Sequence, residues 1–497
     1  MSHFSRRSFL KKSALFGAAA LTARSWGQVT GANGDVRVAV LGLNGRGKNH
    51  LSSLAKVPGV RVVALCDPDQ AVLTRAINAS GGGLTAYPDL RDLLASKDID
   101  AITIATPNHW HSLAAIWACQ AGKDVYVEKP ISHNIWEGRQ LVAAAKKYNR
   151  VVQAGTQIRS GEGLIECVQW VRSGNLGRIK AARGFCYKRR KSIGLTTGPQ
   201  PVPSTVNYDL WCGPSPMEPL RRRQLHYDWH WQYITGNGDV GNQGIHQMDV
   251  ARWFLGEAGL PRHTLSIGGR LGYHDDGDTP NTQVVVHDYA TAPLIFEVRG
   301  LPARADLAST GDTTGLSGAD AAGAAAASMD KYRGVSIGNV IDCEGGSVVV
   351  GAYFDATAYD PAGQVIKTFK GEDRHMGNFI DVVRNRKTEQ LYGPIGEGHI
   401  SSTLCHLGNI SHQLGHATSV GETKEKIKGD ALLTEAHGRM LEHLAVNGVN
   451  VAETPATLGV PLTIDGAAER FVGAGAGDAN AMLTRKYRKG YVVPHLA

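Results

Sequence analysis

The sequence predicts an α/β protein whose N-terminal part is a doubly wound parallel sheet. Short apolar runs rich in β-branched residues alternate with helical patterns through residues 36–154, which is the order expected of a parallel sheet. A glycine-rich turn follows the first run, and polar clusters follow the next three. Because right-handed crossovers bring the C-terminal ends of parallel strands to one edge, these clusters predict a ligand site there.

Size and composition are those of a globular protein with more than one domain. The chain has 497 residues, of which 42% are hydrophobic and 20% charged, so it can bury a large core. The net charge of +8 is spread along the chain. Its densest basic cluster, residues 188–191, lacks an aromatic pattern beside it, so we expect a solvated loop and no nucleic-acid binding. The seven cysteines form no C-x-x-C pair, which indicates neither a zinc site nor a disulfide framework.

The first 34 residues have the pattern of an export signal. Arg6 and Arg7 precede a short alanine-rich apolar run at 13–23, as in twin-arginine signals. The run is too short for a stable transmembrane helix, and no later segment approaches the length of a membrane span. We therefore expect export by the twin-arginine machinery to the periplasm, with no stable membrane span.

The elements of the first domain are expected to alternate, with two successive helices between the second and third strands. Strands are predicted at residues 36–41, 60–66, 99–105, 124–127 and 151–154. Helices are predicted at residues 51–56, 69–80, 89–96, 112–121 and 136–148.

The turn between the first strand and the first helix reads Gly42-Leu-Asn-Gly-Arg-Gly47. A strand that turns through glycines into a helix directs backbone N–H groups and a positive helix end to one point, where a pyrophosphate can bind. Asn44 stands where the dinucleotide fingerprint has its second glycine. The turn alone is also compatible with an ordinary strand–helix connection, and the polar residues at the other strand ends favour a nucleotide site.

Asp67 ends the second strand, about 20 residues beyond Gly47, where a dinucleotide fold places the acid that binds the adenosine ribose. An aspartate before a proline is also a common turn residue, and the spacing favours the binding role. Its carboxylate would repel a 2′-phosphate, so NAD is expected and NADP is less favoured. The predicted cofactor-binding residues are Gly42, Asn44, Gly45, Arg46, Gly47, Asp67, Thr106, Pro107, Asn108, His109, His111, Glu128, Lys129, Pro130 and Gln157.

These residues resemble the Gfo/Idh/MocA oxidoreductases, a family of sugar and inositol dehydrogenases. The resemblance is carried by the glycine turn, Asp67, Thr106-Pro107, Glu128-Lys129-Pro130, Tyr208–Gly213 and Gly238–Asp249. It implies a Rossmann domain followed by a second α/β domain with an open, mainly antiparallel sheet. Apolar runs at 282–286, 294–298 and 347–351 fit strands of that sheet.

The expected domain organisation has four parts. They are a twin-arginine signal and linker (1–34), an NAD-binding Rossmann domain (35–155), a substrate-binding domain (156–440) and a C-terminal extension packed on the core (441–497). Residues 303–330, rich in Ala, Gly, Ser and Thr, are expected to form a flexible insertion. The broad face of the second sheet makes homo-oligomerisation plausible.

The predicted catalytic residues are Lys129, His246 and Asn242. A lysine at a strand end beside the nicotinamide can orient a hydroxyl, stabilise developing alkoxide or relay a proton. His246 has the ordinary pKa of a base that works near neutrality and lies one turn from Asn242. The resemblance implies an aspartate at position 242. Because asparagine cannot accept a proton but can hold a hydroxyl, we expect Lys129 and His246 to carry more of the chemistry, with Asp249 as a structural anchor.

Charged and aromatic side chains suited to sugars complete the predicted substrate site: Lys129, Arg159, Tyr187, Trp229, Asn242 and His246. Weaker candidates are Lys188, His226 and His230, and Trp229 with Trp231 could equally be core residues.

Several histidines have two interpretations. His109 and His111 flank Trp110 in a pattern that can resemble a metal pair, but with no third ligand at suitable spacing we expect cofactor contact and no metal. A His-rich stretch expected to be helical, residues 374–416, holds His399 and His406 seven residues apart. They could line the substrate cleft or be structural.

The resemblance and the export signal together predict an NAD(P)-dependent oxidoreductase that acts on CH–OH groups of a sugar, sugar derivative or polyol. Because a released cofactor would not be recycled outside the cytoplasm, a tightly bound NAD is expected. One alternative is a redox-neutral, NAD-dependent glycoside-cleaving enzyme that works through a transient keto-sugar. Another, raised by Asn242, is a carbohydrate-binding module without activity.

Overall fold

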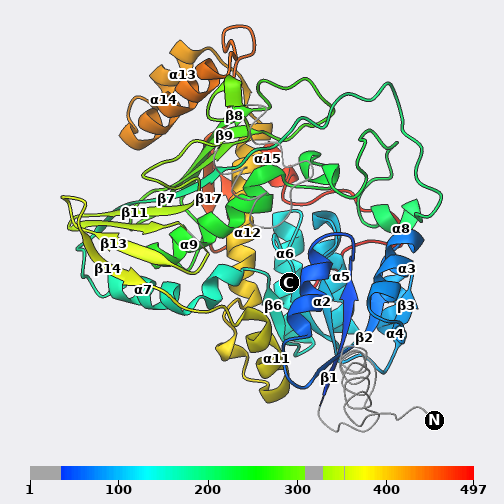
Figure 1. Ribbon diagram of the computed structural model, residues 1–497. Helices are drawn as coiled ribbons and strands as arrows, with labels where there is room; N and C mark the ends of the chain where they lie inside the picture. Colours follow the sequence, from blue (N-terminus) through cyan, green and yellow to red (C-terminus); the bar gives the residue numbers. More distant parts are fainter. Residues whose placement is uncertain (1–34, 308–327, 352) are drawn as a thin grey trace, which may run out of the picture.

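The computed structural model describes residues 35–307, 328–351 and 353–497. They form a six-stranded sheet and a twelve-stranded sheet (Figure 1). The predicted export signal lies outside the described residues, as does most of the predicted insertion at 303–330. Within the described ranges, no helix combines the length and apolarity needed to cross a membrane.

The smaller sheet is the parallel, doubly wound sheet predicted from the sequence. Its strands are β1 (Val36–Leu41), β2 (Val60–Cys66), β3 (Thr85–Tyr87), β4 (Ala101–Ile104), β5 (Asp124–Val127) and β6 (Val152–Ala154). Their order in space is β3-β2-β1-β4-β5-β6, and every neighbouring pair is parallel. The chain reverses direction across the sheet between β1 and β4, which is where such folds bind ligands.

The helices of this domain are α2 (Arg46–Leu54), α3 (Gln70–Ala79), α4 (Leu90–Ala95), α5 (Asn108–Gln120) and α6 (Ile135–Lys147). Helix α5 begins four residues earlier than predicted, directly after Pro107. Proline has a fixed φ and no N–H, both compatible with the entrance of a helix. The polar cluster after β4 is therefore largely the first turn of a helix.

The larger sheet is mixed and mainly antiparallel, as the resemblance implies. Its main strands are β7 (Ile179–Tyr187), β8 (His263–Gly269), β9 (Thr282–Asp288), β10 (Leu294–Arg299), β11 (Ile337–Cys343), β12 (Gly346–Val350), β13 (Ala356–Tyr359) and β14 (Val365–Phe369). Shorter strands are β15 (His416–Ala417), β16 (Thr457–Leu458), β17 (Leu462–Asp465) and β18 (Arg470–Val472). Among the described strands, β7 and β10 are the only parallel pair of this sheet.

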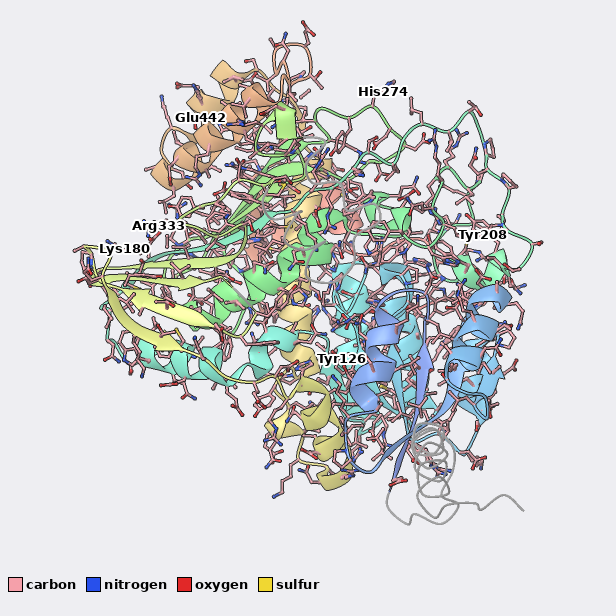
Figure 2. All side chains as sticks on the ribbon, in the orientation of Figure 1. Tyr126, Lys180, Tyr208, His274, Arg333 and Glu442 are labelled. Carbon is pink, nitrogen blue, oxygen red and sulfur yellow. The ribbon has the colours of Figure 1, made fainter. Side chains whose placement is uncertain are left out.

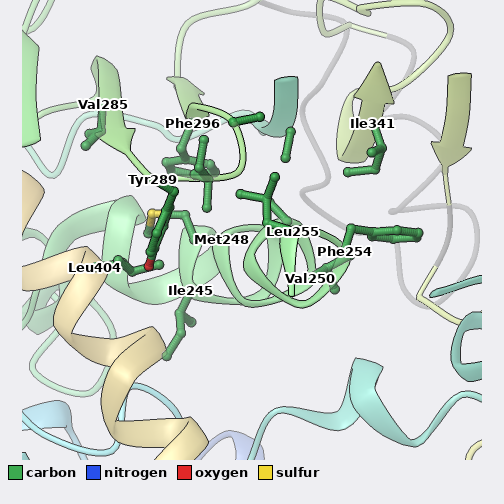
Figure 3. Close-up of a cluster of buried hydrophobic side chains, with 14 of the residues drawn as sticks. Ile245, Met248, Val250, Phe254, Leu255, Val285, Tyr289, Phe296, Ile341 and Leu404 are labelled. Carbon is green, nitrogen blue, oxygen red and sulfur yellow. The ribbon is translucent and has the colours of Figure 1, made fainter. Parts of the chain in front are cut away.

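The core of the larger domain lies between its sheet and three helices, α7 (Glu162–Arg172), α9 (Ile245–Leu255) and α12 (Ile395–Gln413). Figure 3 shows Met248 and Phe254 of α9 close to Phe296 and Ile341 of the sheet. Helix α12 also contacts α6 of the smaller domain. The two sheets therefore share one packed body.

The stretch predicted to be helical from 374 to 416 is interrupted. It forms α11 (His375–Asn385), the short turn η5 (Thr388–Gln390) and α12. Arg386 ends α11 in the left-handed conformation, with φ of 62°, and Pro394 precedes α12. A left-handed cap followed by a proline is a common way to end one helix before another begins.

The remaining elements lie in the long connections and towards the C-terminus. They are η1 (Gln157–Ser160), α8 (Tyr208–Cys212), η2 (Asp228–Trp231), η3 (Val240–Gly244), η4 (Ala305–Leu307), α13 (Val420–Ile427), α14 (Ala431–Val446) and α15 (Ala476–Ala481). In Figure 2, Tyr208 of α8 lies at the outer end of the smaller domain, far from Lys180 near the start of β7, a central strand of the larger sheet.

The last residues return to the smaller domain. Tyr491 and Val493 join its apolar core beside Trp110. Tyr491 Oη donates a hydrogen bond of 2.7 Å to Asp209 of α8, and Arg488 forms an ion pair with the same carboxylate. The C-terminal segment thereby ties α8 to the smaller domain.

Candidate active site

A cavity of about 650 Å³ lies at the C-terminal ends of the parallel strands. One wall comes from the turns after β1, β2, β4 and β5. The other comes from the connection between β7 and α9 and from residues after β12. The predicted convergence of strand ends therefore produces a hollow of ligand size.

The glycine turn forms one end of this cavity. Gly42 has φ of +84°, and a Cβ there would lie 2.6 Å from the Ala105 carbonyl oxygen. A Cβ on Gly47 would lie 1.9 Å from the Gly42 carbonyl oxygen. Both glycines are thus required by close backbone packing, and Gly47 lies beneath the turn outside the cavity lining. Asn44, Gly45 and Arg46 do line the cavity.

Asp67 lies at the end of β2 with its carboxylate held by two backbone N–H groups. Leu43 and Asp69 donate to it over 2.9 and 3.0 Å. Burial raises the pKa of Asp67, and these two hydrogen bonds oppose that rise. Two backbone donors leave part of the acceptor capacity of the carboxylate for ribose hydroxyls.

Glu128 is buried at the end of β5 beneath the cavity. Arg46 Nε donates to it over 2.8 Å, Gln157 Nε2 over 3.0 Å, and His50 Nε2 lies 3.1 Å away. Burial alone would raise the pKa of Glu128, but the charge of Arg46 and the contact with His50 hold it well below its usual range. The carboxylate is therefore ionised and fixed, so its role is to position Arg46 and Gln157.

Lys129 and Asn242 meet across the cavity. Lys129 Nζ donates a hydrogen bond of 2.5 Å to the backbone carbonyl of Asn242. Burial lowers the pKa of Lys129 to about 8, and the cations Arg46, Lys188 and Arg190 act in the same direction. The lysine can thus exchange a proton near neutral pH. Asn242 is one of the residues that line the cavity.

His246 lines the same part of the cavity, in the first turn of α9. Its ring is 5.7 Å from that of Tyr353, edge to face. Burial lowers the pKa of His246 to about 3, and the charge of Lys129 contributes. The expected pKa near neutrality is therefore wrong, because the ring is only 4% exposed. Its Nδ1 is a buried atom with no hydrogen-bond partner among the described residues, so a neutral ring with one unpaired nitrogen lies at the cavity wall.

Two predicted substrate-binding residues lie elsewhere. Arg159 is buried in ion pairs with Asp249 and Glu397, at 2.8 and 3.0 Å. The Tyr187 hydroxyl donates to Glu297 over 2.8 Å. Neither lines the cavity. Their buried partners already satisfy them, so the predicted substrate role of both residues is wrong.

Two predicted cofactor contacts are structural as well. The His109 ring is fully buried, with its nitrogens 3.3 and 3.0 Å from the carbonyls of Thr235 and Trp211. Pro130 accepts from His111 Nδ1 over 2.6 Å and does not line the cavity. The remaining predicted cofactor residues, apart from Gly47, do: Gly42, Asn44, Gly45, Arg46, Asp67, Thr106, Pro107, Asn108, His111, Glu128, Lys129 and Gln157.

The weaker candidates Lys188, His226, Trp229 and His230 all line the cavity. The rings of Trp229 and His230 are stacked with centroids 3.6 Å apart. In contrast, His399 pairs with Glu469 over 3.0 Å and His406 lies 3.1 Å from Ser132 Oγ. The structural interpretation therefore holds for these last two histidines.

Sequence reasoning did not single out several lining residues: Trp110, Arg190, Leu210, Trp211, Tyr227, Gln243, Tyr353, Phe354 and Asp373. The alternation of side chains along an extended strand, continued beyond β7, would have placed Arg190 on the same side as the candidate Lys188. Tyr353 and Phe354 lie in a connection whose approach to α9 depends on the sheet, and no local pattern identifies them.

The residues present fit a nicotinamide dinucleotide. The turn at Gly42 leaves no room for a side chain, Asp67 keeps acceptor capacity, and the buried Thr106 hydroxyl lacks a partner among the described residues while lining the cavity. Fold and site together define a dinucleotide-dependent enzyme of the two-domain type.

Comparison with protein families identifies both domains. Residues 36–156 match the model described as "Oxidoreductase family, NAD-binding Rossmann fold", and residues 169–276 match the family's "C-terminal alpha/beta domain". The chain belongs to the Gfo/Idh/MocA oxidoreductase family, and its cofactor is NAD.

Among curated relatives, a "Glycosyl hydrolase family 109 protein 2" of Shewanella sp. (strain ANA-3) is 34% identical over 205 residues. The match covers 36% of this chain and 45% of the relative, so the chain spans about half the length of that protein.

Solved structures share the fold. The WlbA dehydrogenase from Bordetella pertussis, in complex with NADH and UDP-GlcNAcA, is 20% identical with a TM-score of 0.54, covering 76% of this chain and 95% of the other. Levoglucosan dehydrogenase, in complex with NADH and levoglucosan, is 17% identical with a TM-score of 0.54, covering 75% and 96%.

Proposed function

We propose that the protein is an NAD-dependent oxidoreductase that acts on a CH–OH group of a sugar, sugar derivative or polyol. The observation that carries the proposal is the position of Lys129, Asn242 and His246 on one cavity with the residues that fit NAD. Bound NAD would supply the hydride acceptor for the carbinol carbon. The protein must then orient the hydroxyl and take its proton.

Lys129 is the group best suited to the proton. With its pKa at about 8, the amine is largely protonated at pH 7, and a usable fraction is neutral. Neutral, it accepts the hydroxyl proton; charged, it stabilises the oxygen from which the proton leaves. The neutral His246 ring and the Asn242 amide hold the hydroxyl by hydrogen bonds.

A tightly held cofactor is part of the proposal. The connection after β7 covers the end of the cavity near Asp67: Gln70 N donates to the Thr205 carbonyl over 2.9 Å, and His226 pairs with Asp69 over 2.8 Å. The C-terminal segment fastens α8, whose Leu210 and Trp211 line the cavity. A ligand enclosed by two separate chain segments dissociates only when they move apart.

We also propose export by the twin-arginine route, from the pattern at residues 5–23. That route carries folded proteins, so NAD could be bound before export and retained in the periplasm. A retained cofactor needs a second substrate to restore it. The proposed enzyme would therefore oxidise one carbohydrate and reduce another.

The second candidate is a redox-neutral glycoside-cleaving enzyme that passes through a transient keto-sugar. The similarity to proteins named as family 109 glycosyl hydrolases supports it. Oxidation of a ring carbon would acidify the neighbouring C–H, so the same lysine and histidine could assist loss of the aglycone.

One experiment distinguishes these functions. The purified protein is denatured and assayed for released nucleotide, and the native protein is incubated with sugars and with aryl glycosides. Loss of reduced-nicotinamide absorbance on adding a second sugar supports the oxidoreductase. Aglycone release without net NADH supports the glycosidase. Absence of bound nucleotide and of measurable NAD affinity contradicts both and leaves a carbohydrate-binding module.

A further inference from the structure

The chain beyond β7 continues as an extended strand along one wall of the cavity. Lys188 N donates to the Arg299 carbonyl over 3.0 Å, and Arg190 N donates to the Gly300 carbonyl over 2.9 Å. Because side chains alternate along an extended strand, Lys188 and Arg190 face the cavity. Tyr187 and Arg189 face the opposite side, where they bind Glu297 and Tyr273. The basic cluster expected to be a solvated loop is thus partly a cavity wall.

The two cavity-facing cations differ in their partners. Arg190 is bound by Asp239 through two hydrogen bonds, of 2.8 and 2.7 Å. The Lys188 amine has no hydrogen bond or ion pair with any side chain in the described parts of the chain. Burial and the neighbouring Arg190 both lower the pKa of Lys188. The nearby Asp239 carboxylate acts in the opposite direction, but it is already paired with Arg190. Lys188 and Arg190 together therefore keep a net positive charge at this half-buried wall.

The carboxylates that line the cavity are engaged elsewhere. Asp67 accepts from backbone N–H groups, Glu128 from Arg46, and Asp89 from Arg91. Asp373 accepts the N–H of His375 over 2.8 Å. None of the four has a hydrogen bond with Lys188. A half-buried cation is costly unless it is paired, and here the group to pair with it would have to come from a ligand.

We propose that the substrate is an acidic carbohydrate and that Lys188 binds its anionic group, a carboxylate or a phosphate. Lys188 follows β7 and lies on the wall formed by the larger domain, whereas the turn Gly42–Gly47, which fits the cofactor's phosphates, follows β1 on the wall formed by the parallel strands. Lys188 lies on the same cavity as Lys129 and Asn242. It would anchor one end of a sugar whose hydroxyl reaches Lys129. This inference rests on the proposed function.

The test measures binding independently of turnover. Affinities of the NAD-loaded protein are measured by calorimetry for matched pairs: glucuronate with glucose, galacturonate with galactose, and glucose 6-phosphate with glucose. At least one anionic member should bind about tenfold or more tightly than its neutral partner. Its affinity, and not that of the neutral sugar, should fall as salt is raised.

Substitutions then assign the effect. Lys188→Met should abolish the anionic preference, and Lys188→Arg should keep it. Lys191→Met is the matched control, because this neighbouring lysine is exposed and does not line the cavity; it should keep the preference. Equal or absent binding across all pairs overturns the inference. So does a Lys188→Met variant that loses NAD affinity and keeps the sugar preference. If Lys188→Met does not fold, the salt dependence and Lys188→Arg still decide.

Failure of the proposed function gives a different result. Selective binding of an acidic sugar without any hydride transfer would remove the oxidoreductase activity and leave this inference standing. Hydride transfer to or from neutral sugars alone would support the oxidoreductase activity and contradict the anionic-group site at Lys188.

Discussion

The two ends of the cavity differ in how their charged side chains are paired. At the end formed by the parallel strands, Asp67 is held by backbone N–H groups and Glu128 by Arg46, His50 and Gln157. At the other end, the Lys188 amine forms no hydrogen bond or ion pair with a side chain of the described residues, and the neutral His246 ring keeps a buried, unpaired Nδ1. The first end is preorganised for one fixed ligand, whereas the second leaves a cation unpaired, as suits a substrate that binds and is released.

Lys129→Met, a substitution where the two ends meet, should have the largest effect and should separate substrate chemistry from cofactor binding. We expect turnover to fall by about 10²–10⁴-fold, the range for removing a proton-transfer group, with NAD affinity nearly unchanged. Steady-state kinetics and fluorescence titration of NAD measure the two effects. Unchanged turnover would refute the role assigned to Lys129.

The pH dependence of the oxidation rate tests whether the Lys129 amine accepts the proton. Because the Lys129 amine has a pKa of about 8, the neutral form that accepts a proton is lost as pH falls below 8. Oxidation rates should therefore drop about tenfold per pH unit below that value and level off above it. His246, with its pKa lowered to about 3, should add no inflection between pH 5 and 9. An inflection near 6.5 that persists in Lys129→Met would contradict this assignment.

Gly42→Ala tests whether the strand-end wall is preorganised by its backbone. A Cβ there meets the Ala105 carbonyl at 2.6 Å with φ of +84°, so we expect a loss of about 1–3 kcal/mol in the free energy of unfolding. Chemical denaturation of the NAD-free protein measures it. Gly45→Ala is the control within the same turn: its Cβ would meet no atom within 4 Å, and stability should be nearly unchanged. Equal effects of the two substitutions would refute the close-packing account.

The smallest expected effect concerns the cover of the cofactor. Arg488→Met removes the ion pair with Asp209 of α8, and we expect NAD to dissociate several-fold faster, as followed by competition with a fluorescent analogue. Lys489→Met, at an exposed neighbouring position, should leave the rate unchanged. An identical rate in both variants would show that the C-terminal segment does not hold the cofactor.

The sequence by itself determined the parallel domain and most of its ligand edge. Its strands are short, β-branched and separated by helical periods, and the crossover rule places Gly42, Asp67, Thr106 and Lys129 along one edge with no knowledge of packing. Gly42 is also predictable from its neighbours in sequence, because the tight turn between a strand and a helix requires glycine there. Each of these inferences depends on interactions between residues near in sequence.

Only the tertiary structure decided the opposite wall and the state of its groups. The way in which the large sheet packs against the smaller domain decides which side of β7 and its continuation faces the cavity. As a result Lys188 lines the cavity, whereas the neighbouring Tyr187 points away and binds Glu297. The residue type of Arg159 predicts substrate binding, but its side chain is paired with the buried Asp249, 90 residues further along the chain. The pKa of His246 depends on burial by distant segments. Burial and long-range pairing arise from residues far apart in the chain, so no local pattern can report them.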